Sequence, residues 1–136
     1  MTKKDLQQFR KLQIELESIE EQIAQLDAKI KKATASFGMS PRGGKSANKE
    51  DRIIKLLDLK EDYEIRGGKI IAEQMKIEKE LDKLSDPVEK AVLRYRYINN
   101  MDWEDIQIMI GYERAQTYRI HDRAIKNLQK IKNETK

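Results

Sequence analysis

The feature that most restricts the fold is an unbroken heptad pattern in the first third of the chain. Apolar residues follow one another at spacings of three and four, in the order Phe9, Leu12, Leu16, Ile19, Ile23, Leu26, Ile30, Ala33 and Phe37. This spacing is typical of a helix that buries one narrow seam against another helix. At about 1.5 Å per residue, a helix over 4–36 would be roughly 50 Å long. Such a helix needs a partner.

A partner helix is available later in the same chain. Residues 38–49 read GMSPRGGKSANK, a composition that stops helices and is typical of a flexible linker. Beyond it, apolar residues recur near the helical period at Ile53, Leu56, Leu57, Tyr63, Ile70, Ile71, Met75, Ile77, Leu81 and Leu84. A helix over 50–84, with Asn48 as its N-cap, would match the first in length. The pattern predicts a long antiparallel coiled-coil hairpin over residues 1–85.

Two features of this hairpin leave alternatives open. Gly67 and Gly68 interrupt the second helix at a cost of about 1 kcal/mol each relative to alanine. They indicate either a kink or a place of close backbone approach. The seam can also pair between two chains as well as within one, so a homodimer is expected beside the intramolecular hairpin.

The linker contains a sequence that looks like a nucleotide-binding motif. Gly43-Gly44-Lys45-Ser46 resembles the end of a phosphate-binding loop, but Met39 stands where that motif needs a glycine. A coiled-coil helix, and no buried strand, precedes it. We therefore interpret the segment as a loop that contacts nucleic acid through Arg42 and Lys45.

The residue types present exclude several kinds of site. Among its 136 residues the chain has no cysteine and one histidine, His121, so a disulfide and a zinc site with cysteine or several histidine ligands are excluded. Apolar runs of two or three residues are too short for a transmembrane helix. Acidic pairs such as Glu20-Glu21 diverge on a helix and form no confined catalytic pair. We expect a cytoplasmic protein that is not an enzyme, with no catalytic residue, metal, cofactor, small-molecule substrate or membrane partner.

A second domain is predicted over residues 86–136. Asp86-Pro87 is a typical helix start, with an N-cap aspartate before a proline at the first helical position, and we expect this helix to end near Ile98. A short helix over 103–110, capped by Asp102, precedes Gly111, which supplies a tight turn. The third helix, from about 113 to 132, buries Thr117, Ile120, Ala124, Leu128 and Ile131.

The last two of these helices have the form of a helix-turn-helix, whose second helix can enter the major groove of DNA. Residues 113–136 hold seven basic and three acidic side chains, a surplus that attracts phosphate. Arg114 and Arg119 can bridge guanine, and Gln116 can bridge adenine. We expect phosphate contacts from Tyr118, Arg123, Lys126 and Lys130. A three-helix bundle without DNA binding is the simpler alternative.

Residues 103–128, WEDIQIMIGYERAQTYRIHDRAIKNL, resemble region 4 of sigma-70-type transcription factors. In that region an acidic-Ile-x-x-x-Leu-Gly turn precedes a recognition helix that ends in Arg/Lys-Ala-Leu-x-x-Leu. The corresponding residues are Asp105-Ile106, Ile110-Gly111 and Arg123-Ala124-Ile125 with Leu128. The whole chain is similar to the ArpU-type late transcriptional regulators of phages and prophages of Gram-positive bacteria.

This resemblance implies which residues contact a promoter −35 element. They are Glu113, Arg114, Ala115 and Gln116, with Arg119 one turn later. Glu113 departs from the pattern because a capping serine is usual there, and its carboxylate would repel phosphate. Thr117 replaces a usual valine, which leaves the fold unchanged.

We therefore expect a phage-type transcriptional regulator that binds double-stranded promoter DNA through residues 86–136. The coiled coil would serve for oligomerisation or for contact with the host RNA polymerase or its sigma factor. Two other classes fit the same pattern. A small terminase subunit, which packages DNA, would form a ring of many chains, and a coiled-coil adaptor that binds only protein would show no salt-sensitive DNA binding.

Overall fold

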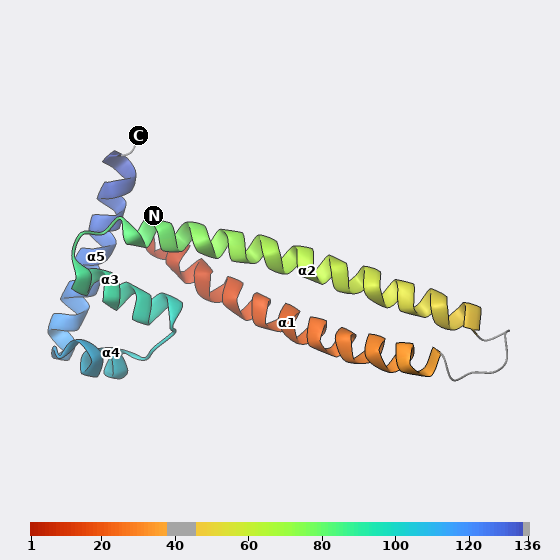
Figure 1. The fold of residues 1–136 in the computed structure, drawn as a ribbon. Coiled ribbons are helices and arrows are strands. Elements are labelled where there is room, and N and C mark those ends of the chain that lie inside the picture. The colour runs from red at the N-terminus through yellow and green to blue at the C-terminus, as the bar shows by residue number, and fades with distance from the viewer. Residues whose placement is uncertain (38–45, 135–136) are drawn as a thin grey trace. The chain divides into compact units, whose positions relative to one another are not determined.

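The structure is a computed structural model that describes residues 1–37 and 46–134. Every regular element among these residues is helical, which confirms the predicted all-α fold class (Figure 1). The expected nucleic-acid contacts of Arg42 and Lys45 lie outside the described residues.

The two long helices of the hairpin are α1, Lys3–Phe37, and α2, Ser46–Asp82. A reciprocal cap begins α1, because the Thr2 backbone N–H donates to Asp5 Oδ2 at 2.9 Å and the Asp5 N–H donates to Thr2 Oγ1 at 3.4 Å. The predicted start of the second helix is wrong. Since α2 begins at Ser46, Asn48 lies within the helix and is not its N-cap, and the linker is shorter than expected.

The chain divides into two compact units, and the division runs through both long helices. One unit comprises Met1–Gln13 with Ala72–Lys136, and the other comprises Ile14–Ile71. The sequence pattern instead suggested a boundary at Ser85. Each unit is described in turn.

In the unit Ile14–Ile71, α1 and α2 pack antiparallel along a buried seam. A Cβ atom at Gly67 would lie 3.6 Å from Ile19 Cγ2 and 3.7 Å from Leu16 Cδ1, which are ordinary van der Waals distances, so Gly67 faces the α1 side of the seam. Further along, Lys60 Nζ lies 2.7 Å from Asp27 Oδ1. The helix is continuous through Gly67 and Gly68, and the space at Gly67 would accept an alanine.

Several apolar residues of α2 lie outside the seam. Leu57, Ile71 and Met75, which the sequence pattern included, are each about half exposed. In the unit that contains Ala72–Lys136, Gln74 occupies a buried position of the seam, and its amide donates to Gln13 Oε1 at 2.8 Å. A polar pair therefore replaces an apolar layer in this part of the seam.

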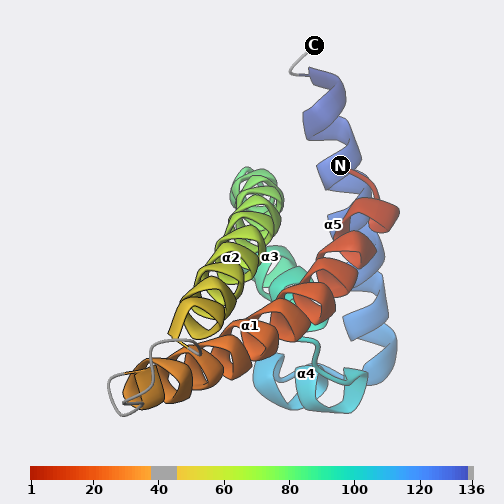
Figure 2. The same cartoon turned by 90° about the vertical axis from the view of Figure 1, so that its right-hand side faces the viewer.

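The other unit joins the ends of both long helices to four shorter segments, α3 (Pro87–Leu93), η1 (Arg94–Ile98), α4 (Trp103–Ile110) and α5 (Arg114–Glu134). Figure 2 shows α4 leading through a short turn into α5. One core cluster takes residues from the start of α1, the end of α2 and the C-terminal segments: Met1, Leu6, Leu81, Leu84, Leu93, Tyr97, Ala124 and Leu128. The start of the chain thus completes the core of the C-terminal helices.

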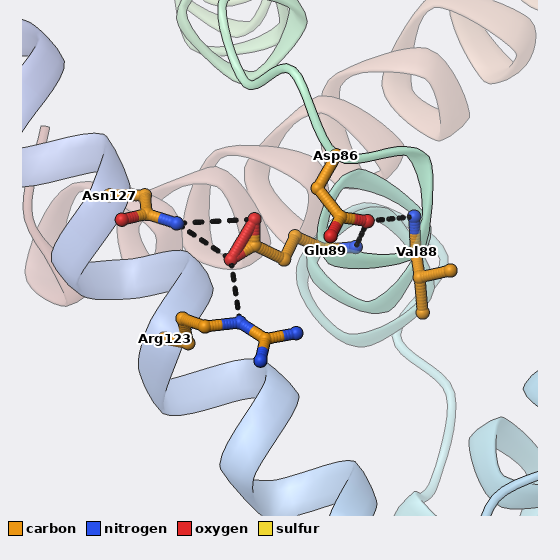
Figure 3. Close-up of polar contacts among 5 residues, drawn as sticks. All are labelled: Asp86, Val88, Glu89, Arg123 and Asn127. Atoms are coloured by element: carbon orange, nitrogen blue, oxygen red, sulfur yellow. Dashed lines mark hydrogen bonds and ion pairs between the residues drawn. The ribbon is translucent and has the colours of Figure 1, made fainter.

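Local chemistry sets the ends of the short helices. Asp86 caps α3 as predicted, because its Oδ1 accepts from the Val88 N–H at 2.8 Å and the Glu89 N–H at 3.3 Å (Figure 3). The predicted cap of α4 is wrong, since Asp102 occupies the N-cap position without a side-chain capping bond. Gly111 ends α4 with φ of 76°, the left-handed conformation that glycine adopts without strain.

Between α3 and α4 the chain makes a π-helical turn, which the sequence did not predict. Its hydrogen bond runs from the Asn99 N–H to the Arg94 carbonyl at 2.9 Å. Asn100 follows with φ of 60°. The turn carries one more residue than an α-helical turn, and it shifts the side chains after Leu93 around the helix axis.

Candidate nucleic-acid interface

The candidate interface is the helix-turn-helix formed by α4, Gly111 and α5. A small core fixes these helices, because Ile106 of α4 and Ile120 of α5 pack in one buried cluster with Val92 of α3. At the start of α5, the Thr117 N–H and hydroxyl both donate to the Glu113 carbonyl at 2.9 Å. The first turn of α5 is therefore held by a side-chain bond as well as a backbone bond.

The residues predicted to contact DNA divide by exposure into two groups. Gln116 and Tyr118 are half-buried. The remaining predicted residues are exposed on α5: Arg114, Ala115, Arg119, Arg123, Lys126 and Lys130. The opposite side of the helix lies in the core, so the two faces of α5 differ sharply in chemistry.

Tyr118 is part of an aromatic stack at the junction of α4 and α5. Its ring centroid lies 4.7 Å from that of Trp103, and the Arg114 guanidinium carbon lies 5.6 Å from the Tyr118 ring. A guanidinium is attracted to the face of an aromatic ring. Tyr118 therefore positions Arg114 as well as packing against α4.

Arg96 is a candidate contact that the sequence analysis missed. Its guanidinium carbon lies 4.8 Å from the Trp103 ring, and its Nη1 donates to the Met101 carbonyl at 3.1 Å. Arg96 and Arg114 line the same hollow of about 520 Å³, together with acidic Asp102 and Glu104. No spacing rule indicated this arginine, because the π-helical turn that precedes α4 brings it to Trp103.

Arg123 differs from the other predicted phosphate contacts because it is already paired. Its Nε donates to Glu89 Oε1 at 3.2 Å, and Asn127 Nδ2 donates to the two oxygens of the same carboxylate at 2.7 and 3.2 Å (Figure 3). Glu89 is only 3% exposed. The pair ties α5 to α3, so Nε of Arg123 is engaged within the protein.

His121 is buried beside this interface. It is 4% exposed, its Nε2 lies 2.7 Å from the Tyr97 hydroxyl, and its Nδ1 lies 3.0 Å from Asp122 Oδ1. Trp103 meets the imidazole edge-on at 5.1 Å between centroids. Burial lowers the pKa of His121 from its ordinary value of 6.5, and the hydrogen bond to Asp122 partly opposes this shift. The neutral imidazole is therefore favoured in the folded protein.

Within 1–37 and 46–134, no group of three or more His, Cys, Asp or Glu side chains is arranged to hold a metal ion. No helix in those ranges combines the length and apolar character needed to cross a membrane.

Residues 37–129 match the profile of a family described as "Protein of unknown function (DUF1492)". The match takes in α2, α3, η1, α4 and most of α5. Comparison with the curated proteins gave no significant match, and comparison with the solved structures gave none either.

Proposed function

The chain belongs to the DUF1492 family, and we propose that it is a transcriptional regulator that binds double-stranded promoter DNA through α4 and α5. The observation that carries this proposal is the two-sided character of α5. Arg119, Lys126 and Lys130 are exposed on one side, while Ile120 and Leu128 on the other side are buried. A recognition helix needs this combination of a basic outer face and a fixed inner face.

We propose that side chains in the first turns of α5 contact the base edges and so recognise the DNA sequence. Arg114 and Arg119 can each bridge O6 and N7 of guanine, and Gln116 can bridge N6 and N7 of adenine. Ala115 is small enough to allow close approach of the helix to the groove floor. Because the Tyr118 ring packs against the Arg114 guanidinium, the Arg114 side chain loses less conformational entropy when it binds guanine.

Phosphate contacts are proposed for the later part of the helix. Lys126 and Lys130 are exposed, and neither forms an ion pair among the described residues. Arg123 contributes only through its terminal nitrogens, because Nε is bonded to Glu89. These contacts fix the position of the protein on the duplex without reading bases.

The wider role is proposed from the resemblance of Trp103 to Leu128 to sigma region 4. We propose that this non-enzymatic protein acts in the cytoplasm on phage or prophage promoters, together with the host RNA polymerase or its sigma factor. The long helices would then hold the polymerase or a second copy of the chain.

The first test measures sequence discrimination. Sites are selected from fragmented prophage-bearing genomic DNA with the full-length chain, and affinities are measured by fluorescence anisotropy on selected and scrambled duplexes. Arg114→Ala and Arg119→Ala should each lose about 1 to 3 kcal/mol of discrimination between the two duplexes. Lys126→Ala and Lys130→Ala should weaken both duplexes about equally and lower the salt slope by about one. Gln129→Ala, an exposed neutral position on the same helix, is the matched control.

Three outcomes would contradict the proposal. A footprint that survives both arginine substitutions would show that α5 is not the recognition helix. An absence of salt-sensitive DNA binding would favour a protein-binding adaptor. Run-off transcription with purified host polymerase tests the regulatory role. Unchanged transcript levels on DNA that the protein occupies would favour a packaging protein. Such a protein forms a ring of many chains, which analytical ultracentrifugation would detect.

A further inference from the structure

A second basic site lies at the end of the hairpin where α1 finishes and α2 begins. A hollow of about 320 Å³ opens between the two helices in the unit Ile14–Ile71. Its lining comes from the last two turns of α1 and the first two turns of α2: Lys29, Lys32, Ala33, Ser36, Lys49 and Arg52. Four of these six side chains are cationic, and none is acidic.

The hollow exists because the heptad seam stops being apolar at this point. Ile53 is an apolar residue of the seam. The next seam position toward the α2 N-terminus lies four residues earlier, at Lys49. An apolar side chain there would fill the space above Ala33, whose methyl group is small. Lys49 is instead half-buried, and its ammonium group helps to line the opening.

The four cations of the hollow have no carboxylate partners among the described residues. Elsewhere in the same unit, lysines are paired: Lys55 Nζ lies 3.1 Å from Asp51, and Lys60 Nζ lies 2.7 Å from Asp27. Like charges around one hollow repel each other, and a bound anion would relieve that repulsion. The arrangement is thus suited to an anionic ligand.

We propose that this hollow binds the phosphate backbone of duplex DNA, as a contact distinct from the helix-turn-helix. The lining has no aromatic ring on which unpaired bases could stack, which disfavours a single strand. Ala33 is the one apolar residue of the lining, so the hollow lacks the large apolar or aromatic side chain that usually anchors a protein partner. The choice of DNA as the anion rests on the proposed function. Binding here is independent of sequence, because phosphates carry no base information.

The consequence is a chain with two DNA contacts on one polypeptide. Engagement of one contact raises the effective DNA concentration at the other, provided that the duplex can reach both. Affinity should therefore rise with duplex length beyond what the helix-turn-helix alone requires. The additional affinity should be the same for any sequence.

The first experiment removes two of the four charges from the full-length chain. On a long non-specific duplex, Lys32→Ala with Arg52→Ala should lower the slope of log affinity against log salt by about two, since each phosphate contact contributes about 0.9. Lys69→Ala with Lys79→Ala removes the same charge from exposed positions elsewhere on α2 and should leave the slope unchanged. Far-UV circular dichroism confirms that both variants stay helical.

A combined variant separates this proposal from the proposed function. A chain with Arg114→Ala and Arg119→Ala should keep salt-sensitive binding to any duplex, and adding Lys32→Ala and Arg52→Ala should weaken that binding and lower its salt slope by about two. If the two α5 substitutions change nothing, the helix-turn-helix proposal fails while the hairpin substitutions still report on this site. If the hairpin double variant binds like the wild type, this proposal is overturned.

A crosslinking experiment gives a direct readout. Because the chain has no cysteine, Ser36→Cys introduces a single attachment point for a photocrosslinker beside the hollow. Irradiation with duplex DNA should give a covalent adduct, in higher yield than from Ser18→Cys, which is exposed in the middle of α1. Equal yields from the two positions would overturn the proposal. If the variant with Lys32→Ala and Arg52→Ala loses binding to an acidic protein but still binds DNA like the wild type, the proposal is also overturned.

Discussion

Glu89 is a buried carboxylate whose partners hold α5 against α3. An ionised carboxylate away from water is costly unless donors surround it, and here the Asn127 amide and the Arg123 Nε supply those donors. The Arg123 side chain is 56% exposed, so solvent screens its attraction and the amide bonds contribute much of the stabilisation. This pairing makes Glu89 a residue on which the position of the recognition helix depends.

Replacement of Glu89 should therefore destabilise the protein. Glu89→Ala removes the acceptor for two donor groups and should lower the free energy of unfolding by about 2 kcal/mol. Urea denaturation followed by circular dichroism measures the change. Glu78→Ala, at an exposed position of α2, should stay within about 0.5 kcal/mol of the wild type. A Glu89→Ala protein as stable as this control would show that the buried pair contributes nothing.

His121 should make stability depend on pH. Burial, with smaller effects of Lys3 and Arg96, lowers its pKa, so the unfolded chain takes up a proton near pH 6.5 before the folded protein does. The contribution of His121 is therefore complete above about pH 6.5 and declines as the pH falls below it. His121→Gln cannot titrate and keeps a hydrogen-bonding group for Tyr97. Urea midpoints at pH 7.5 and 5.5 should differ less in this variant; an equal loss in both proteins would assign the effect to other groups.

At the scale of elements, helix ends set by local chemistry could be predicted from the sequence. Asp86-Pro87 and Gly111 each have a residue type whose backbone preference fixes one conformation, and both behave as expected. The start of α2 was predicted too late, because Asn48 is an acceptable cap by residue type but lies inside the helix. The π-helical turn after Leu93 also has no local signature.

The candidate interface was predictable to a similar extent. Helical periodicity alone places Arg119 and Lys126 on the exposed face of α5, whereas Arg114, seven residues before the buried His121, is exposed at the first position of the helix. The pairing of Arg123 with Glu89 was not predictable, because it depends on which side chains of two distant helices meet.

Gly68 offers a prediction about the second long helix. Unlike its neighbour Gly67, it has no atom within 4 Å of the position that a Cβ would take. Gly68→Ala should therefore raise the free energy of unfolding by up to about 1 kcal/mol, through helix propensity alone. Ala72→Gly, an exposed position one turn later, should lower it by a similar amount, and thermal or urea unfolding measures both. A loss of stability in Gly68→Ala would instead mean that a second chain packs at this position.

At the scale of the whole molecule, the core of the C-terminal helices includes residues from the start of the chain. Met1 and Leu6 lie in the same buried cluster as Leu93 and Leu128. A segment cut at the apparent domain boundary near Ser85 would leave this surface uncovered. The structure therefore predicts that the first turns of α1 stabilise the helix-turn-helix.

Leu6→Ala tests that dependence. Leu6 is fully buried, so its truncation should cost about 2 to 5 kcal/mol. The single tryptophan, Trp103, lies in α4, and its fluorescence should report the same lowered melting temperature as circular dichroism. Ile14→Ala, at a position 60% exposed, should shift the melting temperature little. A lower melting temperature by circular dichroism with an unchanged Trp103 transition would show that the two ends of the chain fold independently.

The shared core also constrains the order in which the chain folds during synthesis. Leu6 leaves the ribosome long before Leu128, so this core closes only after the helix that carries Leu128 has been made. The pairing of α1 with α2 joins segments that are closer in sequence and can form earlier. This pairing brings Leu6 next to Leu81. The contact with Leu128 then requires closure of only the shorter loop between Leu81 and Leu128. The paired long helices thereby keep Leu6 beside Leu81 until α5 has been made.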